Sequence, residues 1–374
     1  MKTIAVEHSW HEMDSSVRIE WNLGKRCNYN CSYCDQLTHD NFSDFLSFEA
    51  AKNTIDKIME KCRDKRIRIS LTGGEPTINP SFLNIIKYMK EAGVSFVSVT
   101  TNGSRTREFY IQAMEYLDNI IFSYHMEYLD RKKYVDAILA CNEYIQKNPK
   151  KRLHVHVMML PTMFNEAVLF METLKKNDIK TVMRRIRPAF KVDHKENIYE
   201  DGRLVDGVIA EPFYAGPTTL LFYKGNSKAG PNCSKDKDYY SDEENVFLTE
   251  NRVKSLSRQT NGSVKTKNNA GSFVNVITYT ESDATEENVN DILVRKENSY
   301  IGWKCWSGVQ TLMINSQDNV FNATCQAAKF GNIRTGFDIP AGPTICTKQW
   351  CLCAADLNTT KIKDDIYQDK IRII

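Results

Sequence analysis

A regular alternation of strand-like and helix-like segments between residues 17 and 186 constrains this chain most. Apolar side chains recur at every second position through Val17, Ile19 and Trp21, which predicts a strand with one buried face. Residues 48–62 instead repeat apolar side chains at helical spacing, behind Ser47 as a candidate N-cap. The two patterns then alternate along the chain. They predict six strands separated by five helices, an order typical of a parallel sheet with right-handed crossovers.

The number of strands limits the architecture. Six parallel strands are too few for a closed eight-fold barrel, so we expect an open sheet or a partial barrel, with ligands at the carboxyl ends of the strands. After the first strand, the predicted strands cover residues 66–71, 94–100, 119–124, 153–160 and 180–186, and the helices after residue 62 run from about 80 to 93, from about 105, from 131 to 146 and from about 165.

Cysteine usage is the second constraint. The 374 residues contain eleven cysteines, and eight of them fall into two local groups. The sequence has no run of eighteen apolar residues and no signal-peptide pattern at its N-terminus, so we expect a cytoplasmic protein, in which structural disulfides are rare. Metal binding therefore explains the two groups best. A net charge of +3 gives no electrostatic case for nucleic acid or an anionic membrane surface.

The first cysteine group, Cys27, Cys31 and Cys34, follows the first predicted strand directly, and the segment TGGEPT at residues 72–77 follows the second. Both therefore fall on the same rim of the predicted sheet. His39 would complete a four-ligand zinc site with the three thiols. Alternatively, three thiolates on one loop hold three corners of a four-iron cluster and leave one iron open for substrate chemistry.

The spacing C-x3-C-x2-C with Tyr33 before the last cysteine, together with LTGGEPT, resembles the radical S-adenosylmethionine (SAM) superfamily. The resemblance implies a partial (β/α)6 TIM-like barrel and a SAM-binding [4Fe-4S] cluster on the three thiols. It also implies that Gly73, Gly74 and Glu75 receive the methionine amino group of S-adenosyl-L-methionine. Glycine permits a close backbone approach, and a carboxylate accepts hydrogen bonds from an ammonium.

The same resemblance implies a mechanism. A flavodoxin or ferredoxin-type reductant supplies one electron, the sulfonium bond of the cofactor breaks, and the resulting 5'-deoxyadenosyl radical takes a hydrogen atom from a substrate carbon. Asn102 in TTNG and Ser123 in FSYH stand where the superfamily often contacts the cofactor, although a turn and a strand end explain them equally well. Tyr33, Asn102 and Ser123 are therefore expected cofactor contacts, and no catalytic acid or base is identified.

The second cysteine group lies near the C-terminus, around a predicted hairpin with its turn at Asp318-Asn319. It resembles the auxiliary-cluster domain called SPASM, or its shorter form, called twitch, with Asn319 in place of the usual turn glycine. A full SPASM pattern needs seven cysteines, so the resemblance implies one auxiliary iron-sulfur cluster, expected to be [4Fe-4S], with one cysteine to spare. A zinc site is the alternative. The five candidate ligands are Cys305, Cys325, Cys346, Cys351 and Cys353.

These observations predict three regions. Residues 15–190 form the barrel, residues 191–300 form a variable polar bridge, and residues 301–374 form the twitch-like domain. Because the first barrel strand begins by Val17, we expect no leader-binding module before it. A small polar substrate, such as a sugar or nucleotide, is therefore favoured over a ribosomal peptide or protein side chain. A non-catalytic iron-sulfur electron carrier is the alternative from another class.

Overall fold

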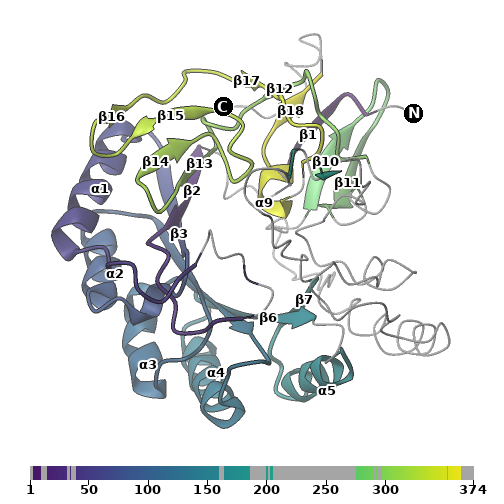
Figure 1. Ribbon diagram of the computed structural model, residues 1–374. Coiled ribbons are helices and arrows are strands. Elements are labelled where there is room, and N and C mark those ends of the chain that lie inside the picture. The colour runs from purple at the N-terminus through teal and green to yellow at the C-terminus, as the bar shows by residue number, and fades with distance from the viewer. Residues whose placement is uncertain are drawn as a thin grey trace.

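The computed structural model describes residues 3–9, 15–31, 34, 39–159, 164–185, 199–200, 203–204, 275–289, 292, 297–351 and 353–363. Two larger sheets organise them (Figure 1). The larger has ten strands in the order β16-β15-β14-β13-β2-β3-β4-β5-β6-β7, and the smaller has six in the order β11-β10-β1-β18-β12-β17. The short strands β8 (Tyr199–Glu200) and β9 (Arg203–Leu204) pair only with each other.

The predicted βα series is confirmed. Six neighbouring strands of the larger sheet run parallel in chain order, and five helices cover the outside of its curve, which gives an open partial barrel (Figure 1). The strands are β2 (Ser16–Asn22), β3 (Arg66–Thr72), β4 (Phe96–Thr101), β5 (Asn119–Tyr124), β6 (Arg152–Met159) and β7 (Thr181–Arg185). The helices are α1 (Phe48–Lys61), α2 (Phe82–Glu91), α3 (Arg107–Tyr116), α4 (Arg131–Lys147) and α5 (Phe164–Lys175), with a short 3-10 turn, η2 (Pro76–Ile78), before α2.

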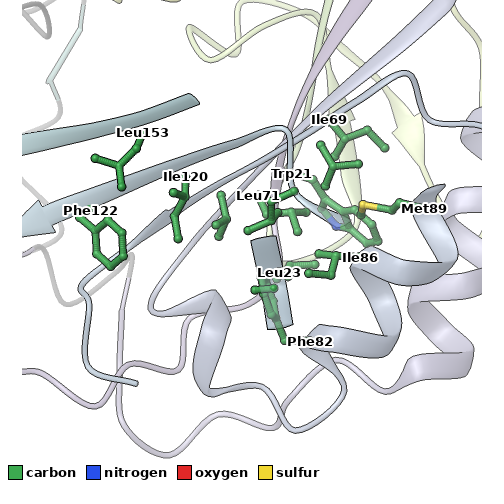
Figure 2. Packing of buried hydrophobic residues seen from close by; sticks show 14 of the residues in the cluster. Trp21, Leu23, Ile69, Leu71, Phe82, Ile86, Met89, Ile120, Phe122 and Leu153 are labelled. Carbon is green, nitrogen blue, oxygen red and sulfur yellow. The ribbon is translucent and has the colours of Figure 1, made fainter. Parts of the chain in front are cut away.

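The core of the barrel lies between the sheet and these helices. Trp21, Ile69 and Leu71 point from the strands toward Ile86 and Met89 of α2 (Figure 2). This face of the strands is buried because apolar side chains alternate with polar ones. Ser47 caps α1 as predicted, since its hydroxyl accepts a hydrogen bond from the Ala50 N–H at 3.2 Å. Cys62 and Cys141 lie in this core, in agreement with their apolar sequence positions.

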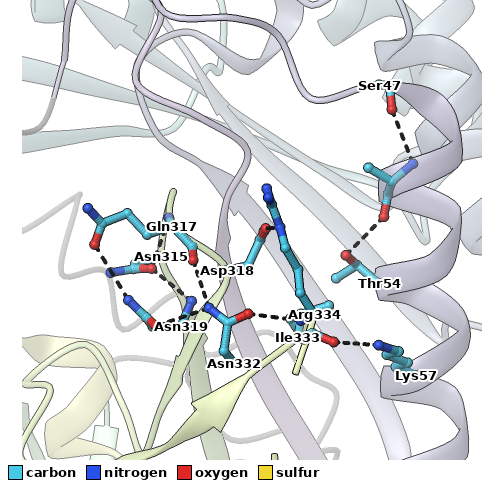
Figure 3. A network of polar contacts seen from close by, with 11 residues as sticks. Ser47, Thr54, Lys57, Asn315, Gln317, Asp318, Asn319, Asn332, Ile333 and Arg334 are labelled. Atoms are coloured by element: carbon cyan, nitrogen blue, oxygen red, sulfur yellow. Dashed lines mark hydrogen bonds and ion pairs between the residues drawn. The ribbon is translucent and has the colours of Figure 1, made fainter. Parts of the chain in front are cut away.

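The C-terminal hairpin extends the barrel sheet itself. Strand β13 (Thr311–Ile314) pairs in parallel with β2, and the antiparallel strands β14 (Asn319–Phe321), β15 (Lys329–Asn332) and β16 (Gly336–Phe337) follow. The turn falls where the sequence predicts it, but the left-handed residue is Asp318, with φ at 61°, rather than Asn319. Asp318 accepts a hydrogen bond from Arg334 at 2.6 Å (Figure 3), which helps to hold this conformation. The expectation for Asn319 was therefore wrong by one residue.

The smaller sheet joins segments that are far apart in the sequence. Strand β1 (Ala5–His8) lies between β10 (Asn275–Tyr279) and β18 (Lys361–Ile362). Strand β12 (Lys304–Cys305) lies between β18 and β17 (Thr344–Ile345), and β11 (Ala284–Asn288) forms the far edge beside β10. The short helix α9 (Ala354–Leu357) precedes β18. None of the helices described here is long and apolar enough to cross a membrane.

Candidate iron-sulfur and cofactor site

The first cysteine group lies on a loop at the carboxyl end of β2. The Cys27 N–H donates to the Asp40 carbonyl at 2.6 Å, and the Asp40 N–H donates to the Lys25 carbonyl at 2.9 Å, so the loop is closed at its base. Cys31 is buried, whereas Cys27 and Cys34 are partly exposed. The Cys34 N–H donates to the Cys31 carbonyl at 3.0 Å. Tyr33, an expected cofactor contact, lies outside the described residues.

The TGGEPT loop packs directly on the backbone that precedes Cys27. The Gly74 N–H donates to the Gly24 carbonyl and the Glu75 N–H to the Arg26 carbonyl, both at 2.9 Å. A Cβ on Gly74 would lie 2.2 Å from the Lys25 carbonyl oxygen, and one on Gly73 would lie 2.5 Å from that of Gly24. Gly73 also adopts φ at 127°, which other residues rarely reach. The close approach that these glycines allow is therefore to the cysteine loop.

Glu75 is a buried hub of hydrogen bonds, with 3% of its surface exposed. One carboxylate oxygen accepts from the Thr77 N–H at 3.0 Å, the Thr77 hydroxyl at 2.5 Å and the Thr101 hydroxyl at 2.7 Å. The other accepts from the Asn102 N–H. Burial raises the pKa of Glu75, and these donors oppose that rise. The carboxylate thus ties the end of β3 to the end of β4.

Asn102 lies beside the cysteine loop, as its place after β4 suggested. Its side-chain amide lies 3.9 Å from the Cys27 sulfur and donates to the Asn28 side-chain oxygen at 2.9 Å. Burial raises the pKa of the Cys27 thiol, while the Tyr29 N–H and the Asn102 amide lower it. Ser123 is buried at the end of β5, opposite His156 of β6. Within the described part of the cysteine loop, no residue forms a hydrogen bond with Ser123, whose role as a cofactor contact is a proposal.

His125 is the site residue that sequence reasoning missed. It follows β5, and its Nδ1 atom lies 3.8 Å from the Cys31 sulfur. Burial lowers the pKa of His125 to about 4, so the ring is neutral at neutral pH. Tyr29 packs edge-on against this ring at 6.4 Å and stacks on Tyr128 at 5.8 Å. The FSYH segment contained this signal, because a histidine there follows a strand that ends at the same rim.

The chemistry of these residues fits an iron-sulfur cluster that is held by thiolates. Thiols of the cysteine loop, a side-chain amide and a neutral imidazole gather where β2, β4 and β5 end. Thiolates are the ligands that iron clusters require, and amide donors near sulfur stabilise their negative charge. The geometry therefore suits the iron-cluster interpretation of the loop. His39, the expected fourth ligand of the zinc alternative, is buried beside Asp40.

Four cysteines of the second group lie close together. Burial, followed by the charges of Asp356, Cys305 and Cys346, raises the pKa of Cys325 to about 12. Those of Cys325 and Cys305 likewise add to the effect of burial on Cys351. Cys346 belongs to the same apolar cluster as Cys351, and its N–H donates to the Trp303 carbonyl beside β12. Thiolates are the ligands that iron-sulfur clusters use, so these four cysteines are candidate ligands of one cluster.

Cys353 faces different neighbours. Burial raises its pKa, as do the charges of Asp356 and Glu20, while the Thr324 hydroxyl lowers it. Arg18 of β2 donates to the Ala355 carbonyl of α9, so this cysteine lies where the barrel meets the C-terminal helix. Burial and Asp356 raise the pKa of Glu20 to about 7, which Arg18 opposes.

Neither group is arranged for a single ion. Among the described residues, no three histidine, cysteine, aspartate or glutamate side chains converge on one metal position. A four-iron cluster is larger than an ion and takes one ligand at each corner, so its thiols need not converge on a point. The side chains of Arg184 and Arg185, as well as Arg187 and Cys233 entirely, lie outside the described residues.

Known proteins resemble parts of this chain. Residues 21–186 match the Radical SAM superfamily. A "Probable GTP 3',8-cyclase" of Thermococcus kodakarensis is 33% identical over 142 residues, which cover 36% of this chain and 44% of that protein. An "S-adenosylmethionine-dependent nucleotide dehydratase" of Pseudoalteromonas ulvae is 24% identical over 229 residues, or 50% of this chain and 73% of that protein. A "Mycofactocin maturase MftC" of Mycobacterium ulcerans is 28% identical over 100 residues, or 27% and 26%.

The chain spans only 24 to 44% of the length of the first four curated relatives. Among solved structures, "Native anSMEcpe with bound AdoMet and Kp18Cys peptide" superposes with a TM-score of 0.48 at 12% identity, over 86% of this chain and 79% of that one. The matched segment 21–186 contains the end of β2, the cysteine loop, the TGGEPT loop, Asn102 and the parallel strands β3 to β7. Through this segment, the chain belongs to the radical SAM superfamily.

Proposed function

We propose that this protein is a radical SAM enzyme whose SAM-binding [4Fe-4S] cluster is held by Cys27, Cys31 and Cys34. The observation that carries the proposal is the packing of the TGGEPT loop and Asn102 against the cysteine loop. With the cluster reduced by a flavodoxin or ferredoxin-type protein, bound SAM would supply a 5'-deoxyadenosyl radical that abstracts hydrogen from a substrate carbon. The polypeptide contributes binding and orientation.

Each residue of the site has a proposed task. Gly73 and Gly74 fix the TGGEPT backbone against the loop, and backbone groups there are the proposed receivers of the cofactor amine. Glu75 acts through Thr101 and Asn102, because its oxygens already accept hydrogen bonds from protein groups. Asn102 orients a thiolate, and Ser123 stays a proposed cofactor contact. His125 is a neutral donor or acceptor beside Cys31.

The substrate class that we propose is a nucleotide or a similar small polar molecule. The relatives named as a GTP cyclase and as a nucleotide dehydratase support this choice, since both names specify nucleotides. A ribosomal peptide is the second candidate, and the similarity to a mycofactocin maturase supports it. Incubation of the reduced enzyme with nucleoside triphosphates, and separately with peptides, distinguishes them through substrate-dependent 5'-deoxyadenosine formation.

For the C-terminal region, we propose one auxiliary [4Fe-4S] cluster with Cys305, Cys325, Cys346 and Cys351 as ligands. The mutual effects of their charges support this set. Cys353 is then the spare cysteine, because its neighbours are Arg18, Glu20, Asp356 and Thr324. Four thiolates saturate the cluster, which suits electron relay rather than substrate binding.

Anaerobic reconstitution tests the proposal. The enzyme with SAM and dithionite should form 5'-deoxyadenosine, and the full-length Cys27→Ala/Cys31→Ala/Cys34→Ala variant should form none while retaining about four irons. Cys62→Ala/Cys141→Ala is the matched control, because both cysteines lie in the apolar core, and it should keep about eight irons. Turnover by the triple variant would refute the assignment, and a reduced, fully loaded protein that never cleaves SAM would favour an electron carrier.

A further inference from the structure

Lys361 is a buried cation beside the second cysteine group, and it has no role in the two candidate cluster sites as described so far. Only 2% of its surface is exposed. Its ammonium donates to the carbonyl oxygens of Asp356 at 2.6 Å, Thr359 at 2.8 Å and Leu357 at 3.3 Å. A neutral amine has only two hydrogens, so three such bonds require the charged form. The Tyr300 ring centroid lies 5.0 Å from the nitrogen, which further favours a cation.

The charge of Lys361 faces the cysteines. Lys361 and Cys305 are direct partners across the antiparallel pair β18 and β12, so their side chains project from the same face of the sheet as neighbours. The same charge lowers the pKa of Cys351, against the larger effect of burial. Strand pairing and electrostatics therefore agree in placing the ammonium next to two of the four proposed ligands.

Lys361 has no anionic partner within the described part of the chain. No carboxylate there forms an ion pair with it, and its hydrogen bonds end on neutral carbonyls. A buried charge is costly unless an opposite charge compensates it. Four thiolates around an iron cluster would supply that negative charge. The carboxylate of Asp356, whose backbone carbonyl binds the Lys361 ammonium, is directed elsewhere, to the Thr324 hydroxyl at 2.6 Å and the Cys325 N–H at 2.8 Å.

We propose that Lys361 is the fixed counter-charge of the auxiliary cluster and sets its reduction potential. This inference rests on the proposed function, since it requires a cluster on the second cysteine group. Net charge and nearby fixed charges are among the factors that set such potentials. A cation beside the cluster stabilises the reduced form, which carries one more negative charge. Asp356, whose carboxylate binds the backbone of Cys325, acts in the opposite direction.

An EPR-monitored redox titration of the full-length protein with both clusters tests this. Lys361→Met should lower the equilibrium constant for reduction of the auxiliary cluster at least tenfold. For a one-electron couple, this corresponds to a midpoint potential that is lower by about 59 mV. Lys361→Arg should stay close to wild type, because it keeps the charge. Asp356→Asn should raise the midpoint potential, because it removes a negative charge and retains an acceptor oxygen.

The outcomes are separable. If Lys361→Met keeps about eight irons and titrates at the wild-type potential, the inference is overturned. If that variant loses its auxiliary irons, Lys361→Gln takes its place in the titration, because its side-chain amide can still donate to the carbonyl oxygens, and a wild-type potential then overturns the inference. The full-length triple variant of Cys27, Cys31 and Cys34 assigns the auxiliary signal. If this triple variant binds no iron, the auxiliary cluster of the proposed function is refuted. If it binds iron but substitution of Lys361 does not shift the midpoint potential, only this inference is refuted.

Discussion

The two cysteine groups reach their geometry by different routes. The first sits on one loop, between residues 27 and 34, and one neighbouring turn supports it through glycine backbone contacts. The second is drawn from residues 305 to 353 and is assembled by pairing of β12, β17 and β18 with the N-terminal strand β1. One site is local, whereas the other depends on the whole C-terminal sheet.

This difference predicts how each site fails. A local site fails when its supporting backbone is displaced, because there is little space around it to absorb a new atom. An assembled site has separate supports for each ligand, so each cysteine can be lost or spared individually. The charges around the two sites also differ. The first has Asn102 and the neutral ring of His125 next to its sulfurs and one buried acid, Glu75, whereas the second has a buried cation, Lys361, as well as a buried acid, Asp356.

The largest expected effect comes from Gly74→Ala. Its Cβ would lie 2.2 and 2.4 Å from the carbonyl oxygens of Lys25 and Arg26, so the TGGEPT loop must move away from the cysteine loop. A displacement near 1 Å costs on the order of 100-fold in rate, and 5'-deoxyadenosine formation should fall accordingly. Gly342→Ala is the control, because no atom lies within 4 Å of its added Cβ. Equal activity of the two variants would contradict the local character of the first site.

The assembled site should distinguish its cysteines by iron content. Cys351→Ser should lose about four irons, because it removes one of four ligands. Cys353→Ser should retain about eight, because the charges that act on its thiol are those of Asp356 and Glu20 and we propose it as the spare cysteine. Iron and sulfide analysis of both reconstituted proteins measures the contrast. The reverse pattern would exchange the roles of the two residues.

Glu75→Gln should separate positioning from direct cofactor contact. Both carboxylate oxygens of Glu75 accept hydrogen bonds, so the amide nitrogen of glutamine must face at least one buried donor and leave it unsatisfied. This costs about 1–3 kcal/mol of stability. We therefore expect a lower Tm even without SAM, with the exposed Glu60→Gln variant unchanged. A variant with wild-type Tm and only a raised KM for SAM would instead show that Glu75 contacts the cofactor.

A pH-dependent effect should appear at Glu20, between the two regions. Its pKa is about 7 in the folded protein against 4.5 normally. Its contribution to stability is therefore complete below the unfolded pKa and is lost as pH rises toward 7. Across this pH window, the free energy of unfolding of Glu20→Gln should rise relative to that of the wild type by up to about 1.4 kcal/mol per pH unit. Urea unfolding at pH 4.5 and pH 8 measures it, and a gain that does not grow with pH would exclude Glu20 as the cause.

The βα series could be predicted because each element repeats a local pattern. Alternation in β2, helical spacing in α1 and the Ser47 cap are all visible within a few residues. The cysteine loop was found for the same reason. His125 was missed because its proximity to Cys31 depends on where β5 lies in the sheet relative to β2, the strand that precedes the cysteine loop. The left-handed turn residue was misplaced by one position, because Asp318 and Asn319 tolerate that conformation equally.

The sequence by itself determined the parallel strands, their helices, the cysteine loop and the superfamily, because these depend on short-range periodicity and spacing. Only the tertiary structure decided that β13 joins the barrel sheet beside β2 and that β1 crosses to the sheet of β12 and β18. It also decided that Lys361 faces Cys305 and that Cys353 faces Arg18. Pairing between distant strands leaves no local pattern, since it is set by which edges and charges the folded chain brings together.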